Sequence, residues 1–259
     1  MLPILFWLGA YAAPSVTVDA PALTNDATPT ITGTTNLPAG ATVTLVVTDA
    51  NGATQTITAT VQAGGTYSVD VPVALAEGGY TVVATATDAA GNSATANDAG
   101  AIDLTAPSVT VDAPALTNDS TPTITGTTNL PAGSTISLLV TDANGSSQTI
   151  TATVVAGGTY SVDVPVALAE GSYTVVATAT DAAGNSATAN DAGAIDLTAP
   201  AVTLALDPVT ADNVLSASEA GGNVVLTGRA GGDARPGDTV TLAINGQSYQ
   251  ATVGAGGAF

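Results

Sequence analysis

The chain has 259 residues with 21 acidic side chains, two arginines, no histidine and no cysteine. Its net charge of −19 excludes the basic surface that nucleic acids and anionic membranes require. Without His, Cys or Lys the chain cannot form Ser-His-Asp or Cys-His sites, Schiff bases or a P-loop, so we expect no enzymatic activity.

The first twelve residues, MLPILFWLGAYA, differ in composition from everything that follows. Their apolar run Leu2–Leu8 is far shorter than the roughly 20 residues that a membrane-spanning helix needs. Ala10-Tyr11-Ala12 resembles a signal-peptidase site, but no charged segment precedes the apolar run. Residues 1–12 are therefore either a truncated signal peptide or an unrelated N-terminal fragment, and we expect no membrane insertion.

Residues 13–105 (repeat 1) and 106–198 (repeat 2) are the same 93-residue unit, with nine differences between the copies. Each copy contains eight acids and no cationic side chain. A period of this length matches an autonomous domain rather than a solenoid repeat. The sequence therefore predicts domains arranged as beads on a string, an architecture that typically supplies length or valency.

Within repeat 1, apolar and polar residues alternate, and turn residues interrupt the alternation every 8–15 positions, which is typical of a β-sandwich. Seven strands are predicted, so each repeat is expected to be an all-β, seven-stranded immunoglobulin-like β-sandwich. The apolar positions expected to face inward are these: Val16 and Val18 (first strand), Ile31, Val43, Leu45, Val47, Ile57, Ala59, Val61, Tyr67, Val69, Val71, Tyr80, Val82, Ala84 and Ala86.

Tyr80 begins the sixth predicted strand, after Leu75 and Gly78. A tyrosine there can donate its hydroxyl to upstream backbone, as in the tyrosine corner of immunoglobulin-like sandwiches, or simply fill the core. Asp98 follows Asn97 in the last strand, where it indicates a β-bulge or a second ion site, and we favour the bulge.

Residues 199–259 begin in register with the repeats, at Ala199-Pro200, and then diverge. Aligning Ala63–Tyr67 with Ala255–Phe259 shows that the last three strands of a sandwich have no counterpart here. We therefore expect this third unit to be a truncated immunoglobulin-like repeat of a second subtype, with a core that does not close.

Several segments resemble the bacterial immunoglobulin-like tandem repeats of giant surface adhesins and biofilm-associated proteins. They are YTVVATATDAAGNSATA at Tyr80–Ala96, AIDLTAP at Ala101–Pro107, TADNVLSASEAGG at Thr210–Gly222 and GDTVTLAINGQSYQATV from Gly237. The resemblance covers residues 13–259. It implies calcium-dependent stalks that hold a ligand-binding tip away from the bacterial cell surface, in an extracellular location.

Topology predicts where the carboxylates of the two repeats gather. One end of repeat 1 should carry Asp26 and Glu77, with Asp103 at the start of a short linker that Pro107 stiffens. The facing end of repeat 2 should present Asp181 and Asn185 from its last hairpin.

Ca²⁺ takes six to eight oxygen ligands, so Asp103, Asp181 and Asn185, with Asp26 or Glu77, have the right chemistry for a calcium site. The same arrangement would recur at Asp196, before the third unit. Zinc is not expected, since no Cys or His is present. The alternative is that these Asp and Asn residues only build turns and end strands.

Three functions from different classes are consistent with these features. The first is a calcium-stiffened structural extender of a cell-surface adhesin, which supports cell adhesion or biofilm formation and whose partners are the neighbouring repeats. The second is a carbohydrate- or protein-binding module that uses its outward threonines. The third is a structural component of an extracellular matrix or surface layer. Exposed aromatic side chains around a groove would favour the second.

Overall fold

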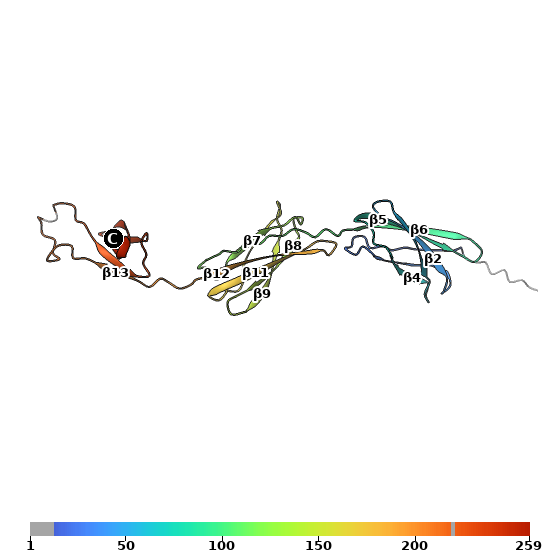
Figure 1. The fold of residues 1–259 in the computed structure, drawn as a ribbon, viewed down its shortest axis with the longest axis horizontal. Helices are drawn as coiled ribbons and strands as arrows, with labels where there is room; N and C mark the ends of the chain where they lie inside the picture. The colour runs from blue at the N-terminus through green and yellow to red at the C-terminus, as the bar shows by residue number, and fades with distance from the viewer. Residues whose placement is uncertain (1–12, 219–220) are drawn as a thin grey trace, which may run out of the picture. The chain divides into compact units, whose positions relative to one another are not determined.

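The computed structural model describes residues 13–218 and 221–259 (Figure 1). The predicted segment 1–12, with its possible signal peptide, lies outside the described residues. Contacts divide the chain into one unit that ends at Asp196 and a second unit, Leu197–Phe259. The first unit contains both repeats.

Each repeat forms six strands in two antiparallel sheets, which confirms the predicted all-β class. The strands of repeat 1 are β1 (Thr30–Thr34), β2 (Thr42–Thr48), β3 (Thr54–Thr60), β4 (Thr66–Asp70), β5 (Gly78–Thr87) and β6 (Ser93–Ile102). Those of repeat 2 are β7 (Thr123–Thr127), β8 (Thr135–Thr141), β9 (Ser147–Thr153), β10 (Thr159–Asp163), β11 (Gly171–Thr180) and β12 (Ser186–Ile195). The sheets are β1-β4 with β3-β2-β5-β6, and β7-β10 with β9-β8-β11-β12.

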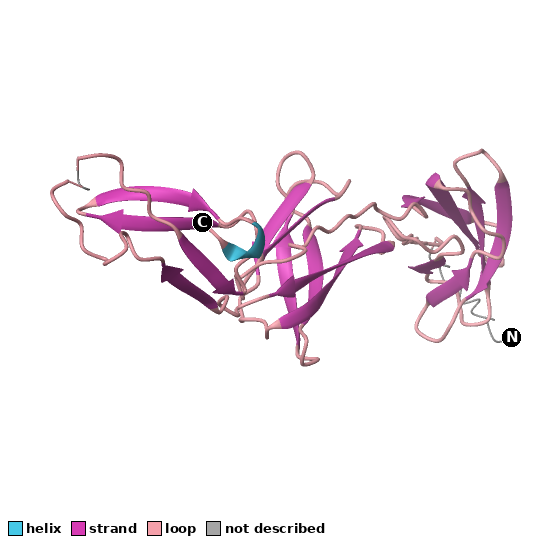
Figure 2. Ribbon diagram, turned by 60° about the vertical axis from the view of Figure 1, so that its left-hand side comes forward, coloured by secondary structure: helices cyan, strands magenta, loops and turns pink. Residues whose placement is uncertain are grey.

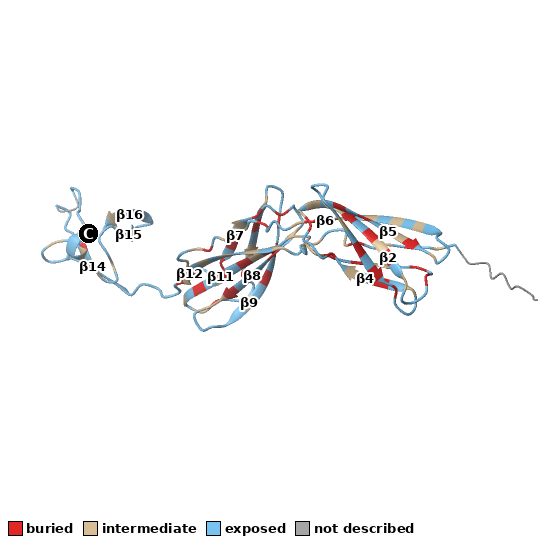
Figure 3. Ribbon diagram, turned by 45° about the vertical axis from the view of Figure 1, so that its right-hand side comes forward, coloured by how far each residue is buried: buried red, intermediate tan, exposed pale blue. Residues whose placement is uncertain are grey.

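The core lies between the two sheets of each repeat. The predicted alternation is confirmed, because buried and exposed positions alternate along β2 and β5 (Figure 3). Val43, Leu45 and Val47 are fully buried, while the residues between them reach the surface. Seventeen buried apolar residues form the core of each repeat, which gives a domain without disulfides a continuous apolar interior.

The first predicted strand is wrong as a continuous strand. Residues 13–24 instead make isolated bridges, Val16 to Thr35 and Asp19 to Thr32 on one sheet and Thr24 to Ile102 on the other. Pro21 lies between these bridges, and proline has no N–H with which to continue a ladder. The segment therefore changes sheets at this point and covers one edge of each.

Two buried tyrosines attach this segment to the sandwich. Tyr67 donates its hydroxyl to the carbonyl of Thr17 at 2.5 Å, and Tyr80 donates to the carbonyl of Pro21 at 2.9 Å. The predicted hydrogen bond from the Tyr80 hydroxyl to upstream backbone is present, but it does not form a tyrosine corner, since the acceptor lies 59 residues upstream rather than in the adjacent connection. Tyr80 therefore fills the core and also holds the first segment in place.

Asp98 contributes a third attachment. Its Oδ2 accepts the N–H of Ala20 at 2.8 Å, and the N–H groups of Ala20 and Ala99 hold the pKa of this carboxyl below its usual range. The predicted β-bulge is wrong, because β5 and β6 pair without a break from Gly78 opposite Ile102 to Thr87 opposite Ser93. The Asp98 side chain instead binds the backbone of the first segment where that segment runs along β6.

Alkaline pH is expected to unfold the repeats through these tyrosines. Burial raises the pKa of Tyr67, Tyr80 and Tyr160 from the ordinary 10.0 to about 12, and the charge of Asp98 adds to the effect at Tyr80. Below pH 10 both folded and unfolded chains are protonated. Between about pH 10 and 12 only the unfolded chain loses these protons, so the free energy of unfolding falls as pH rises. Urea titrations across this range, with near-ultraviolet absorbance, should show tyrosine ionisation and unfolding together. Full ionisation of the folded repeats near pH 10 would contradict the assignment.

The second unit is smaller and less well packed than the first. Figure 2 shows its strands in magenta and its short helix in cyan. Its strands are β13 (Val202–Leu206), β14 (Gly228–Gly232), β15 (Thr239–Ile244) and β16 (Gln247–Thr252), followed by the short 3-10 helix η1 (Ala255–Gly257). The strands form two separate pairs, β13-β14 and β15-β16. The core of its described residues contains only Ala230, Val240 and Val253, whereas Leu204 is 58% exposed and Val225 is 74% exposed.

This difference predicts the order of proteolysis. A protease of broad specificity should cleave within 199–259 before it cleaves 13–198, because local opening requires less free energy where few apolar contacts must break. Mass spectrometry of the stable products should give a fragment that ends near residue 198. Equal survival of the two regions would contradict the expected difference in packing.

Candidate inter-repeat junction

The linker between the repeats is attached to repeat 1 at Thr105. The N–H of Thr105 donates to Oδ1 of Asp103 at 3.1 Å, and its hydroxyl donates to Oε1 of Glu77 at 2.5 Å. Asp103 directly follows β6, and its N–H donates to the carbonyl of Thr24 at 3.0 Å. The start of the linker is therefore fixed to the body of repeat 1 by hydrogen bonds.

The hairpin between β11 and β12 supplies the opposite side of the junction. Oδ1 of Asp181 accepts the N–H groups of Ala183, Gly184 and Asn185 at 3.0, 2.9 and 2.8 Å. The side-chain amide of Asn185 donates to Oδ2 of Asp181 at 3.0 Å. Burial raises the pKa of the Asp181 carboxyl, but these donated hydrogen bonds outweigh it and the pKa lies below the usual range. Asp181 therefore stays ionised and holds the hairpin in one conformation.

One hydrogen bond crosses directly from repeat 2 to repeat 1. Nδ2 of Asn185 donates to the main-chain carbonyl of Asp103 at 2.8 Å. On the same hairpin, a methyl group added at Gly184 would lie 3.4 Å from Nδ2 of Asn25, in the first connection of repeat 1. The predicted meeting of these two ends of the repeats is thus present in the structure.

The same hairpin in repeat 1 serves as an internal comparison. Asn92 donates to Oδ2 of Asp88 at 2.9 Å, as Asn185 does to Asp181, but it is exposed whereas Asn185 is half-buried. A methyl group added at Gly91 would touch nothing within 4 Å. Since the two hairpins have the same sequence, repeat 1 causes the additional burial of the second one.

The structure brings together some of the predicted ligands and not others. Asp103, Asp181 and Asn185 are linked through the Asn185 amide, and Glu77 joins them only through Thr105. Oδ1 of Asp26 accepts the N–H and hydroxyl of Thr28, at 2.8 and 2.9 Å, and so builds its own turn. Asp196 directly follows β12, at the end of the first unit, where its N–H donates to the carbonyl of Thr117.

The junction offers the kinds of ligand atom that calcium binds, namely carboxylate, amide and carbonyl oxygens. The Asp103 carbonyl and Oδ2 of Asp181 both lie within 3.0 Å of one point, the position of the Asn185 amide nitrogen. Within residues 13–218 and 221–259, no group of three or more acidic side chains is arranged to hold a metal ion.

Sequence reasoning did not identify Thr105, whose hydroxyl connects the linker to Glu77. A threonine two residues after an aspartate is a local signal for a turn, but the contact with Glu77 depends on the tertiary fold. The amide of Asn185 was predicted as a metal ligand through its oxygen, whereas the structure uses its nitrogen as a hydrogen-bond donor.

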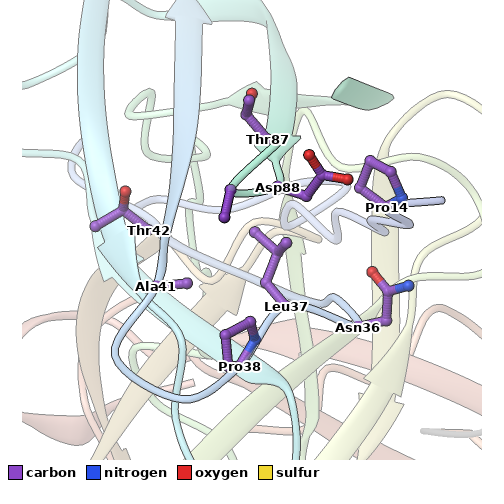
Figure 4. A pocket seen from close by; sticks show the side chains of 9 residues that line it. Pro14, Asn36, Leu37, Pro38, Ala41, Thr42, Thr87 and Asp88 are labelled. Carbon is purple, nitrogen blue, oxygen red and sulfur yellow. The ribbon is translucent and has the colours of Figure 1, made fainter. Parts of the chain in front are cut away.

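Repeat 1 has a shallow hollow at its own hairpin end, lined by Pro14, Asn36, Leu37, Thr87 and Asp88 among others (Figure 4). Its lining contains no aromatic side chain. The tyrosines of both repeats, Tyr67, Tyr80, Tyr160 and Tyr173, are at most 2% exposed. Residues 13–198 therefore offer no aromatic surface on which a sugar ring could stack.

Two adjacent segments of the chain, residues 13–105 and 97–197, match the family model for the bacterial Ig-like domain. The chain belongs to the bacterial Ig-like domain family. This confirms the family resemblance and places both copies of the repeat within it.

Three of the solved structures similar to these bacterial Ig-like repeats are of large bacterial adhesins or adhesion proteins. A tetra-tandem repeat in the extending region of a large adhesion protein is 31% identical, with a TM-score of 0.37 over 95% of this chain and 65% of that one. A Ca²⁺-stabilized adhesin with which an Antarctic bacterium reaches out and binds ice is 35% identical, with a TM-score of 0.47 over 96% and 65%. A 1.5-MDa bacterial ice-binding adhesin is 29% identical, with a TM-score of 0.43 over 95% and 84%.

This chain therefore spans about two thirds of the length of the first two similar structures, 65% in each case. No curated protein matches it. Among its described residues, no helix is long and apolar enough to cross a membrane.

Proposed function

We propose that this chain is an extender segment of a bacterial cell-surface adhesin, in which tandem Ig-like repeats supply length and so support cell adhesion or biofilm formation. The observation that carries the proposal is the junction between two nearly identical repeats. The linker between the repeats is hydrogen-bonded to repeat 1 through Thr105, and the β11-β12 hairpin of repeat 2 is hydrogen-bonded to Asp103 of repeat 1. A connection with contacts on both sides transmits orientation from one repeat to the next, as a stalk requires.

The composition supports an extracellular stalk rather than a binding head. Each repeat carries eight carboxylates and no cation, which favours solubility and opposes collapse of the chain onto itself. The buried tyrosines leave repeats 1 and 2 no aromatic platform for a carbohydrate. A ligand of the parent adhesin would therefore bind outside these two repeats.

We further propose that a calcium ion binds at the junction between repeats 1 and 2. Asp103, Asp181 and Asn185 would provide oxygen ligands, with Asp26 or Glu77 completing the set and Asp196 serving the next junction. The chemical type of these donors supports this assignment, as does the uncompensated negative charge on both sides. When bound, the ion would neutralise carboxylates of two repeats at once. The chain's own contribution is to hold Asp181 ionised and to fix the hairpin that carries it.

A pair of matched variants tests the calcium site. Asp181→Asn removes one negative charge at the junction, and Asp88→Asn makes the same change in the equivalent hairpin of repeat 1. We expect the full chain to bind calcium with a dissociation constant of about 10⁻⁴–10⁻³ M, as extracellular sites do. Asp181→Asn should weaken binding in isothermal titration calorimetry, whereas Asp88→Asn should leave it unchanged. If both variants bind like the original chain, or if magnesium and calcium act alike, the ion only screens the surface charge.

A further inference from the structure

Strand β3 is an open edge of the four-stranded sheet in repeat 1. It pairs with β2 on one side and with no strand on the other. Its sequence, TQTITAT, contains no charge, no proline and no glycine, and its four threonines and one isoleucine have high β-propensity. An edge of this kind presents unpaired N–H and C=O groups to any strand that can approach it.

The other three sheet edges of the same repeat are protected. The edge at β6 is covered by the first segment, where Thr24 bonds to the Ala101 carbonyl at 3.1 Å, and it carries Asp98. The edge at β1 is covered by the same segment, through the N–H groups of Thr17 and Asp19. The edge at β4 is only five residues long and ends in Asp70. Strand β3, with seven residues and no charge, has none of these protections.

One contact covers the beginning of β3. The side-chain amide of Gln55 exchanges two hydrogen bonds with the backbone of Val73, at 2.7 and 3.1 Å. At the other end of the strand, the side-chain amide of Gln62 donates to the carbonyl of Thr60 at 3.2 Å, so Thr56–Ala59 stay open along the edge. In repeat 2, Gln148 bonds to Val166 at 2.8 and 3.2 Å and β9 is the edge strand, but Val155 stands at the position of Gln62.

The surface beside β3 is also free of charge, although the repeat carries eight acids. The residues that face outward on the four-stranded sheet are threonine, serine, valine, asparagine, alanine and glycine. They are Thr42, Thr44, Val46, Thr48, Thr54, Thr56, Thr58, Thr60, Gly79, Thr81, Val83, Thr85, Thr87, Ser93, Thr95, Asn97, Ala99 and Ala101. A second copy of this acidic chain can therefore approach the β3 edge without placing carboxylates of its own outer sheet face next to carboxylates of this one.

We propose that β3 is a strand-addition site for β3 of a second copy of this chain, and that β9 is the equivalent site in repeat 2. Antiparallel pairing centred on Thr58 would place Thr56 opposite Thr60 of the second copy and join two four-stranded sheets into one. Such an interface is self-complementary, as a two-fold dimer requires. It goes beyond the extender role by giving the stalk a lateral partner.

The association should strengthen with salt and need no calcium. Each repeat has a charge of −8, so two chains repel each other at a distance, and ions screen this repulsion beyond about 8 Å at physiological ionic strength. The pairing groups themselves are backbone amides and carbonyls, which salt affects little. Sedimentation velocity on the full chain, from micromolar to millimolar concentration and in parallel series with EDTA and with calcium, should show the same dimer in both series, increasing with sodium chloride.

Two charge variants locate the interface. Thr58→Glu with Thr151→Glu places carboxylates opposite each other in the paired edges and should weaken association by about tenfold or more. Thr81→Glu with Thr174→Glu adds the same charge to the same outer face but on β5 and β11, inside the sheet, and should associate like the original chain. All four threonines are exposed, so the fold should tolerate each change; circular dichroism will check this.

Three results would overturn the proposal. The chain could remain monomeric at millimolar concentration in high salt, the variants on β5 and β11 could lose association as much as those on the edges, or association could require calcium. Loss of association in the β5 and β11 variants would mean that the two chains pack through their sheet faces. A requirement for calcium would mean that they associate through their carboxylates. Because the dimer is expected in EDTA, its absence there leaves the calcium junction untouched.

Discussion

Replacing Gly33 and Gly126 by alanine is expected to lower the thermal unfolding midpoint of the two repeats by about 15 °C. Gly33 lies opposite Tyr67 in the β1-β4 pair, and the tyrosine ring passes over it to reach Thr17. A methyl group at Gly33 would lie 2.2 Å from the Thr17 carbonyl oxygen and 2.4 Å from Cζ and Oη of Tyr67. Gly126 has the same distances to Thr110 and Tyr160.

The expected loss follows from two effects. Overpacking a closed core costs about 1–3 kcal/mol, and displacing the tyrosine removes a hydrogen bond worth about 1 kcal/mol. Together they predict a loss of roughly 3 kcal/mol for each repeat. Gly79→Ala is the control, since the nearest atom to its methyl group would lie 3.9 Å away and repeat 2 already has Ser172 at that position. Differential scanning calorimetry will measure both thermal unfolding midpoints. If the control and the variant with alanine at Gly33 and Gly126 unfold at the same temperature, the tyrosine contact does not stabilise the fold.

Asn185→Ala is expected to uncouple the two repeats without unfolding either. The substitution removes the Asn185 hydrogen bond to Asp103 and also its bond to Asp181. A net value of about 1 kcal/mol for the crossing bond corresponds to roughly a fivefold shift toward separated repeats. Asn92→Ala is the matched control, because it removes the bond to Asp88 in repeat 1 but touches no second repeat.

Segmental ¹⁵N relaxation measures this coupling. The original chain and Asn92→Ala should give repeats 1 and 2 a shared rotational correlation time, whereas Asn185→Ala should give each repeat a shorter time of its own. Identical correlation times in both variants would mean that the crossing hydrogen bond does not orient the repeats.

The interior of the sandwich was predictable because its signal is local. A period of two places Val43, Leu45 and Val47 on one face whatever the rest of the fold does, and all three are buried. The first strand was not predictable in the same way. Its apolar alternation suggested a regular strand, but Pro21 interrupts the ladder and the chain moves to the other sheet.

Long-range polar contacts were the least predictable features. Alternation correctly placed Tyr67 and Tyr80 inward, yet nothing local shows that their hydroxyl groups reach Thr17 and Pro21. Asp98 similarly suggested a bulge, because an acid within a strand has no obvious local partner. Its partner, the N–H of Ala20, is 78 residues away in the sequence.

The junction was predictable in outline and not in detail. Strand order alone placed the hairpin of repeat 2 against Asp103, as the structure shows. Which atom of each side chain faces the other depends on local turns, and these turns already engage Asp181 and Asp103 through backbone N–H groups. Calcium binding by the Asp181 and Asp88 variants tests the assignment of the ligands.

Small-angle X-ray scattering of the full chain, in millimolar calcium and in EDTA at matched ionic strength, tests the stiff stalk most directly. The proposed junction predicts a narrow distribution of distances and a large maximum dimension in calcium, with a broader distribution and a smaller mean size in EDTA. Superimposable scattering curves under the two conditions would contradict it.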